Sequence, residues 1–170
     1  MSGPSVIEAL GGLPEPLATE LLTSPLVANL ATLNADWSIH LVPVWFLSER
    51  LALLVPTSGN SRKARNLERD PRSTVMLHES RGGIDVRGLT LVGHAQIVRG
   101  AEAVALNDRI HRKYVSAQGL ALERVRDFLA SDDVTLRFVV EHATWWDETE
   151  TDAARDLRES GEAVNTDRVR

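Results

Sequence analysis

The most chemically suggestive part of the sequence is one short basic stretch, GNSRKARNLERDPRS, at positions 59–73. It places five basic and two acidic residues between positions 62 and 72, in a chain whose formal net charge is −5. Arg62 and Lys63 would fall in the first turn of a helix, where unpaired N–H groups and a partial positive charge favour an anion. Gly59 would let the backbone approach a ligand, and hydroxyl groups stand nearby at Thr57, Ser58 and Ser61. The stretch therefore predicts a grip for one anionic group such as a phosphate.

The same stretch also fits a plain surface helix, in which the arginines pair with acids such as Glu68 and Asp70. Exposed ion pairs of that kind contribute little to stability. The local sequence leaves both interpretations open. The sequence has no Gly-rich Walker pattern and no GxGxxG motif after a strand, so neither a P-loop nor a Rossmann site competes for the phosphate.

The elements that must position this stretch follow from hydrophobic patterning. Apolar or alternating runs predict six strands, at 26–34, 39–47, 50–57, 73–79, 84–100 and 134–146, separated by polar breaks such as NADWS and SE. Helical spacing predicts helices at 14–24, 61–69, 101–115 and 122–131. Glycines at positions 88 and 93 predict that the longest strand is bent or bulged in its middle.

This order of elements predicts a fold that is mainly β with helices (α+β), a six-stranded antiparallel β-barrel and not a parallel βαβ sheet. A chain of 170 residues is long enough for one core, and we expect one domain over residues 1–147. From Asp147 onward, eight acidic residues stand against four basic ones. We therefore expect residues 148–170 to be a polar acidic C-terminal tail without the apolar content for core packing.

Composition excludes several function classes. The chain has no cysteine, so disulfides, thiolate metal sites and a cysteine nucleophile are excluded. The five histidines lack metal-ligand spacing, and we expect no metal site. Most of the net charge falls in the tail, which argues against general nucleic-acid affinity. With no apolar run approaching the roughly 20 residues of a membrane span and no signal-like N-terminus, we expect a cytoplasmic protein.

The basic stretch and its surroundings resemble a known family. SGNSRKARNLERDPR, preceded by ATLNADWSIHLVPVWFLSERLALLVPT and followed by GLTLVGHAQIV, is similar to the pyridoxamine 5′-phosphate oxidase-like family of split β-barrel flavoproteins. More narrowly, it looks like the actinobacterial branch of FMN- or coenzyme F420-dependent reductases. The resemblance covers residues 20–147. It implies a homodimeric split barrel that holds its cofactor in the groove between the subunits.

The resemblance also implies site residues. It assigns the cofactor phosphate to Arg62 and Lys63, with Ser61 beside them. The backbone of one strand would run along the flavin ring, at His40, Leu41, Val42, Pro43, Val44 and Trp45. The end of the next strand would touch the ring or the ribityl chain, at Pro56, Thr57 and Ser58. Either Arg87 or Gly88 stands where the oxidases have a flavin-contacting glutamine, and Trp145 or its neighbour Trp146 would place an aromatic ring near the flavin.

The function implied is an FMN- or F420-dependent oxidoreductase that transfers a hydride to or from a small organic substrate, with no catalytic side chain that we can name. In F420-using relatives a further basic residue often stands two positions before the lysine; here that position is Ser61, and FMN fits at least as well. Oxidation of pyridoxamine phosphate is disfavoured, because TWWDETETDAARD replaces the family's Arg-x-His-Asp-Arg stretch. The alternatives are a non-catalytic flavin or tetrapyrrole carrier of the same fold, and a structural dimer with a partner-docking helix.

Overall fold

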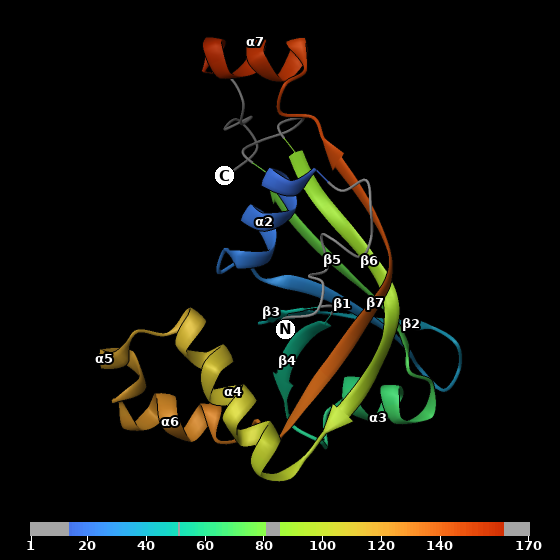
Figure 1. Cartoon of the computed structure of the whole chain (residues 1–170), viewed down its shortest axis with the longest axis vertical. Coiled ribbons are helices and arrows are strands. Elements are labelled where there is room, and N and C mark those ends of the chain that lie inside the picture. The colour runs from blue at the N-terminus through green and yellow to red at the C-terminus, as the bar shows by residue number, and fades with distance from the viewer. Residues whose placement is uncertain (1–13, 51, 81–85, 162–170) are drawn as a thin grey trace, which may run out of the picture.

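The computed structural model describes residues 14–50, 52–80 and 86–161, within which seven strands form one antiparallel sheet (Figure 1). The strands are β1 (Ala28–Leu33), β2 (Ile39–Val44), β3 (Leu47–Glu49), β4 (Ala52–Thr57), β5 (Arg72–Ser80), β6 (Val86–Val98) and β7 (Val134–Asp147). Their order across the sheet is β2-β1-β5-β6-β7-β4-β3. The helices are α2 (Glu15–Thr23), α3 (Arg62–Arg69), α4 (Gly100–Tyr114), α5 (Ala117–Leu120), α6 (Glu123–Leu129) and α7 (Asp152–Ser160).

The expectation of six strands is wrong at one place. The segment 39–47, expected as one strand, contains the end of β2 at Val44 and the start of β3 at Leu47. The SE pair expected as a break lies inside β3. β2 and β3 form the two opposite edges of the sheet, and only Trp45 and Phe46 connect them. This short connection brings the two edges together, so the sheet curls into a split barrel.

The two longest strands, β6 and β7, pair along most of their length and carry a bulge at Val92/Gly93. A side chain at Gly93 could not be accommodated, because its Cβ would lie 2.0 Å from the carbonyl oxygen of Val139. The predicted irregularity in the long strand is therefore confirmed at its second glycine. Bulges of this kind increase the local bend and twist of a strand, which lets β6 and β7 follow the curvature of the barrel.

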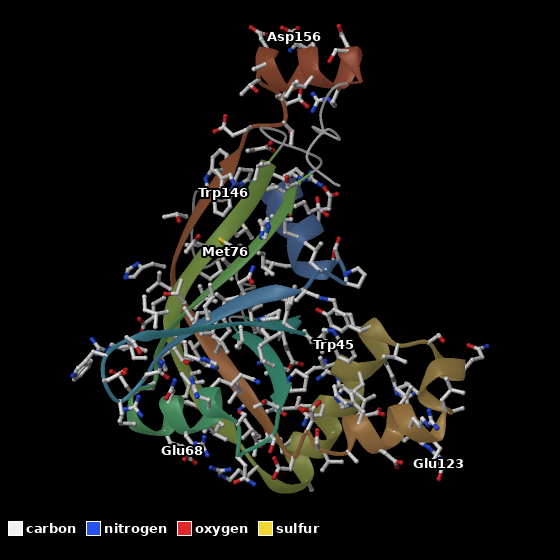
Figure 2. The ribbon with its side chains drawn as sticks, turned by 180° about the vertical axis from the view of Figure 1, so that it is seen from behind. Trp45, Glu68, Met76, Glu123, Trp146 and Asp156 are labelled. Carbon is white, nitrogen blue, oxygen red and sulfur yellow. The ribbon has the colours of Figure 1, made fainter. Side chains whose placement is uncertain are left out.

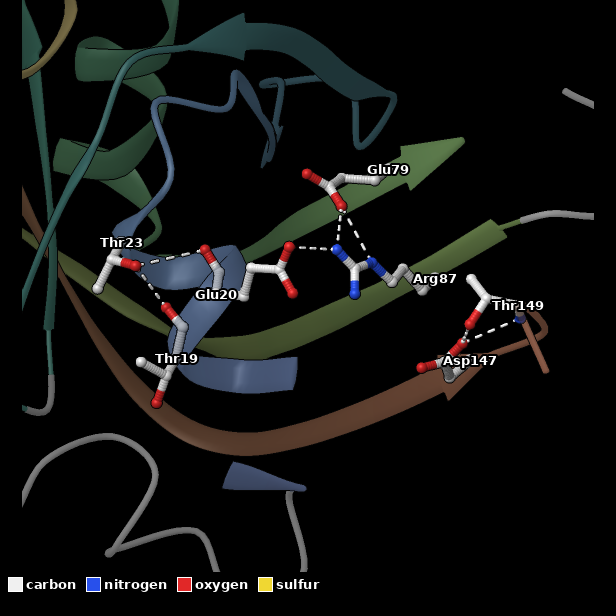
Figure 3. Close-up of polar contacts among 7 residues, drawn as sticks. All are labelled: Thr19, Glu20, Thr23, Glu79, Arg87, Asp147 and Thr149. Carbon is white, nitrogen blue, oxygen red and sulfur yellow. Dashed lines mark hydrogen bonds and ion pairs between the residues drawn. The ribbon is translucent and has the colours of Figure 1, made fainter. Parts of the chain in front are cut away.

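Helix α2 packs on one end of the sheet, and Arg87 helps to fasten it there (Figure 3). Its apolar face is buried in the core. The Arg87 guanidinium lies 2.5 Å from a carboxylate oxygen of Glu20 on α2 and 2.6 Å from one of Glu79 on β5. The hydrogen bonds to Glu20 and Glu79 raise the pKa of Arg87. This arginine therefore has a structural role in tying α2 to β5 and β6.

The expected acidic tail contains one further helix, α7, which lies beyond the end of the sheet (Figure 1). The Thr151 side chain caps its first turn by accepting a hydrogen bond from Ala154 N–H at 3.2 Å. Ala154 is the single buried residue of this helix. Up to residue 161 the tail is mostly exposed, and residues 152–160 of it are helical; the rest of the predicted tail lies outside the described residues. No helix in the described part of the chain has both the length and the apolar character to cross a membrane.

The connection between the two sheet edges is closed by residues of α4. The Tyr114 hydroxyl accepts a hydrogen bond from Phe46 N–H at 3.0 Å and donates to the Leu26 carbonyl at 2.7 Å. The Trp45 ring stacks on Tyr114, with ring centroids 4.9 Å apart. The Lys113 ammonium lies 3.8 Å from the centre of the fully buried Phe46 ring. These contacts satisfy backbone groups at a point where the sheet ladder is interrupted.

We predict that Tyr114→Phe lowers the stability of the protein. The substitution keeps the ring that stacks on Trp45 but leaves the Phe46 N–H without its partner, which costs about 1–3 kcal/mol when the group is buried. Urea unfolding followed by far-ultraviolet circular dichroism measures the change. A variant as stable as the parent chain would contradict the assigned role of the hydroxyl.

Lys113 gives a prediction about pH. It is half-buried, and burial lowers its pKa from 10.5 to about 8. Between these two values the unfolded chain binds more protons at this residue than the folded chain does, so the Lys113 contribution to the free energy of unfolding rises with pH. We predict that Lys113→Met removes this rise and leaves the contribution of other groups unchanged.

Urea unfolding of both proteins at several pH values between about 8 and 10.5 covers the window in which the Lys113 contribution changes. The free energy of unfolding of the parent chain should increase relative to that of Lys113→Met as pH increases. Parallel pH dependences in the two proteins would contradict the assignment.

Candidate functional site

The predicted phosphate grip forms a sharply defined helix start. Ser61 is the N-cap of α3, and its hydroxyl oxygen accepts hydrogen bonds from Ala64 N–H and from the Thr57 hydroxyl, both at 3.2 Å. Because both lone pairs of that oxygen are used, its own proton is left to donate to another group. The N–H groups of the first helical turn point out of the helix beside it. The Ser61 N-cap thus fixes the position of the hydrogen-bond donors at the start of α3.

The structure separates four of the five basic residues of this stretch into two groups, and the fifth, Arg65, is exposed. Arg72 pairs with Asp70 at 2.6 Å, and this arginine lowers the pKa of Asp70 to about 2. Arg69 donates to the Leu33 carbonyl and so ties the end of α3 to β1. In contrast, Arg62 and Lys63 form no ion pair with any residue in the described ranges. The interpretation as a merely self-paired surface helix therefore fits Arg69 and Arg72 but does not fit Arg62 and Lys63.

The surroundings of Lys63 favour the binding of an anion. Burial lowers its pKa, and the nearby negative charge of Asp132 only partly opposes that shift. A half-buried ammonium without an ion-pair partner gains more from an incoming anion than a fully solvated one does. Arg62, which precedes it, is exposed. The pair thus places one buried and one accessible cation at the start of the same helix.

Strand β2 lies close to these cations. The pKa of His40 is lowered by burial first and then by the positive charges of Arg62 and Lys63. β2 pairs with β1 only, so part of its backbone N–H and C=O groups face away from the sheet. The described site therefore combines an open strand edge at His40, Leu41, Val42, Pro43 and Val44 with the start of α3. The fold brings together these sequence-predicted residues.

The residues between β4 and α3 are used partly for structure. Pro56 and Thr57 are buried at the end of β4, and the Ser58 hydroxyl accepts a hydrogen bond from Asn60 N–H. Gly59 N–H donates to a carboxylate oxygen of Asp133 at 2.6 Å. The expected approach of the Gly59 backbone to a ligand therefore competes with this internal carboxylate. Ser61, Arg62 and Lys63 remain the groups best placed for a phosphate.

Trp45, Gly88 and Trp145 have different surroundings from those residues. The Trp45 side chain packs between Tyr114 and His111, on the side of α4. Gly88 and Trp145 lie on neighbouring positions of β6 and β7, far along the strands from α3. Figure 2 shows Glu68 of α3 and Trp146 at opposite ends of the molecule. A single chain does not bring Gly88 or Trp145 to the cation pair.

Gly88 is explained by packing. A Cβ atom at this position would lie 2.3 Å from Cζ2 of Trp146 and 2.6 Å from the carbonyl oxygen of Leu77. The Trp146 ring therefore rests on the bare backbone of β6, as aromatic side chains do opposite strand glycines. Arg87, the other candidate at this place, is held by Glu20 and Glu79.

Sequence reasoning missed two groups that shape the site. Asn66 is buried and donates to the Thr32 hydroxyl and to the Asn34 side chain, which fixes α3 against β1. His111 on α4 lies 3.0 Å from a carboxylate oxygen of Asp132, next to the turn that holds Gly59. Asn66 lies two positions from Ala64 and therefore off the Ala64–Leu67 face, so helical spacing carried no signal for it. The sequence offered none for a pair separated by 21 residues.

A seven-stranded antiparallel sheet that curls into a split barrel places the chain in the class of split-barrel proteins. The chain belongs to the pyridoxamine 5′-phosphate oxidase family, whose family model matches residues 15–131. No match was found among curated proteins.

Solved structures with the same fold have low sequence identity. A conserved hypothetical protein from Mycobacterium tuberculosis is 23% identical, with a TM-score of 0.66, over 87% of this chain and 90% of that one. A protein described as an F420 reductase is 21% identical, with a TM-score of 0.60, over 74% of this chain and 94% of that one. The heme storage protein HutZ from Vibrio cholerae is 20% identical, with a TM-score of 0.62, over 79% of this chain and 94% of that one. These similarities establish the fold.

We predict that Gly88→Ala destabilises the protein in the absence of any cofactor. Overpacking of this kind costs about 1–3 kcal/mol, and urea unfolding of the cofactor-free protein measures it. Adding Trp146→Ala should restore only part of the loss, because the Leu77 carbonyl remains in the way. If Gly88→Ala unfolded at the same urea concentration as the parent chain, the packing explanation of this glycine would be wrong.

Proposed function

We propose that this protein is a homodimeric oxidoreductase that binds FMN or coenzyme F420 and transfers a hydride to or from a small organic substrate. The observation that carries the proposal is the cation pair Arg62 and Lys63, which has no internal ion-pair partner in the described residues and stands at a capped helix start beside an open strand edge. Family membership and the likeness to a protein described as an F420 reductase support it.

The residues present fit the phosphate of such a cofactor. Arg62 and Lys63 would bind it with charge-assisted hydrogen bonds, and the Ser61 hydroxyl and the first N–H groups of α3 would add neutral ones. Two cations together with the helix start match the charge of a phosphate monoester. The half-buried position of Lys63 would keep water away from part of the phosphate.

The ring would lie along β2, whose backbone from His40 to Trp45 would donate hydrogen bonds to it, and Pro56, Thr57 and Ser58 would contact the ring or the ribityl chain. When bound, a flavin or deazaflavin supplies the hydride chemistry. The protein orients the ring, and backbone N–H groups on β2 stabilise negative charge on it. Pro43 has no N–H, so donation falls to its neighbours.

The second subunit would cover the outer face of the sheet. Leu41, Ala31, Thr74 and Val92 form one row across four strands. The exposed fractions of Ile39, Leu41 and Val92 are 70%, 61% and 43%, and a hollow of about 310 Å³ opens between these strands. Exposed apolar surface continuous over several strands is typical of a protein interface. In such a dimer, Gly88 and Trp145 would serve the cofactor site of the other subunit.

The cation pair can be tested directly by titrating the protein with FMN and with F420, following absorbance and fluorescence. The double variant Arg62→Ala/Lys63→Ala should bind much more weakly, because charge-assisted contacts contribute about 1.5–3 kcal/mol each. Arg65→Ala is the matched control, since Arg65 is an exposed arginine of the same helix. Equal affinity of the double variant and the parent chain would overturn the phosphate assignment.

The same preparation separates the enzyme from a carrier. Bound cofactor that is reduced and reoxidised by an organic acceptor over many cycles supports the oxidoreductase. Heme is the relevant competitor, because proteins described as heme storage and heme binding share the fold. Tight heme binding that survives Arg62→Ala/Lys63→Ala, without redox turnover of a flavin, would favour the tetrapyrrole carrier instead.

A further inference from the structure

A second hollow, of about 550 Å³, is lined by residues of α4, α5 and α6 and by Asp132, and Figure 1 shows where these helices lie. The three helices pack beside one end of the barrel. Apolar side chains that include Val104, Leu120 and Leu129 form one part of its wall. Polar side chains that include His111, Arg126 and Asp132 form another. Its volume is in the range of small-molecule sites in proteins.

The polar wall is rigidly built. His111 is only 8% exposed, and its Nε2 lies 3.0 Å from a carboxylate oxygen of Asp132. The buried Asn107 amide donates to the carbonyls of Asp132 and Val134 at 2.9 and 3.1 Å, which fixes the turn that carries the carboxylate. The Thr135 hydroxyl donates to the Asn107 side-chain oxygen at 2.6 Å. The position of the imidazole is therefore set before any ligand arrives.

The second ring nitrogen of His111, Nδ1, is open to solvent. Nδ1 makes no hydrogen bond within the described segments, and those segments contain no fully buried side-chain nitrogen or oxygen that lacks a partner. Nδ1 must therefore be accessible, and the hollow is the space that His111 lines. With Nε2 held by Asp132, Nδ1 is the ring atom that can meet a ligand.

Among the charged side chains that line the hollow, one arginine has no ion-pair partner in the described part of the chain. Arg112 is paired with Asp108, with Nε 2.8 Å from a carboxylate oxygen. Asp132 is paired with His111. For Arg126 the described part of the chain supplies neither an ion pair nor a side-chain hydrogen bond. The hollow thus offers one arginine without an ion-pair partner in the described residues, one imidazole nitrogen without a hydrogen bond and an apolar wall.

We propose that this hollow binds a small organic monocarboxylate with an apolar body. The carboxylate would accept hydrogen bonds from the Arg126 guanidinium and, with His111 in its protonated form, from Nδ1–H, while Nε2–H donates to Asp132. The apolar body would lie against Val104, Leu120 and Leu129. The site is separate from the phosphate grip and does not depend on which cofactor the protein uses, so it goes beyond the proposed oxidoreductase function.

Octanoate is a suitable probe, because it joins one carboxylate to an apolar chain of moderate length. Isothermal titration calorimetry should give a dissociation constant of about 1 mM or tighter, and amide signals of α4, α5 and α6 should shift in heteronuclear NMR spectra. Octanol, which has the same chain length without the charge, should bind at least tenfold more weakly. Saturating FMN or F420 should leave octanoate binding unchanged, which distinguishes this hollow from the cofactor groove.

Two variants locate the site. Arg126→Ala should weaken octanoate binding at least tenfold, whereas Arg124→Ala, which removes the same charge from an exposed position of α6 outside the hollow, should leave it unchanged. Ala121→Trp fills the hollow from an exposed position and should abolish binding. Circular dichroism confirms that each variant is folded.

Three outcomes would overturn the proposal. They are no octanoate binding to the parent chain at several millimolar, equal losses in Arg126→Ala and Arg124→Ala, or full binding by folded Ala121→Trp. A negative result for octanoate would leave the cofactor assignment intact, because the hollow contains none of the residues proposed to bind the phosphate.

Discussion

The structure depends on one closure, at the two residues that carry the chain from β2 to β3. Trp45 and Phe46 move from one edge of the sheet to the other, where no neighbouring strand can pair with their backbone. The Tyr114 hydroxyl takes the place of that strand for Phe46, and the stacked Trp45 ring fixes the direction of the turn. Because the closure holds the edges together, β2 stays unpaired on its outer side and the start of α3 stays beside it.

The hydrophobic pattern of the sequence was sufficient to predict most helices and strands, but not the division between β2 and β3. The strands at β1, β4, β5, β6 and β7 and the helices α2, α3, α4 and α6 are confirmed within a few residues. The division at Val44 was missed because IHLVPVWFL is apolar except at His40, and the pairing of its last residue with β4 shows that this residue belongs to another strand. A continuous apolar run indicates that a segment is buried, but it does not indicate which neighbouring strand the segment pairs with.

The candidate site could likewise be predicted only in part from the sequence. The sequence placed Arg62 and Lys63 at a helix start, but it could not show that Arg69 and Arg72 have partners and that these two do not. Only the Asp70–Arg72 pair is local in sequence, whereas Arg69 reaches the Leu33 carbonyl on β1, and Lys63 is half-buried and influenced by the charge of the sequence-distant Asp132. Gly88 illustrates the opposite case, in which a position suggested by family likeness is explained by the Trp146 ring.

The turn between α6 and β7 links two regions through adjacent side chains. Asp132 points to His111 on α4, and Asp133 holds the backbone of Gly59 just before α3. Asp132 and Asp133 are adjacent in sequence, so a backbone shift that displaces one residue also displaces the other. The length of this turn is therefore under a double constraint: an insertion of even one residue would pull the helical cluster and the start of α3 out of register together, whereas the α5–α6 connection, which holds no such pair, can vary in length far more freely.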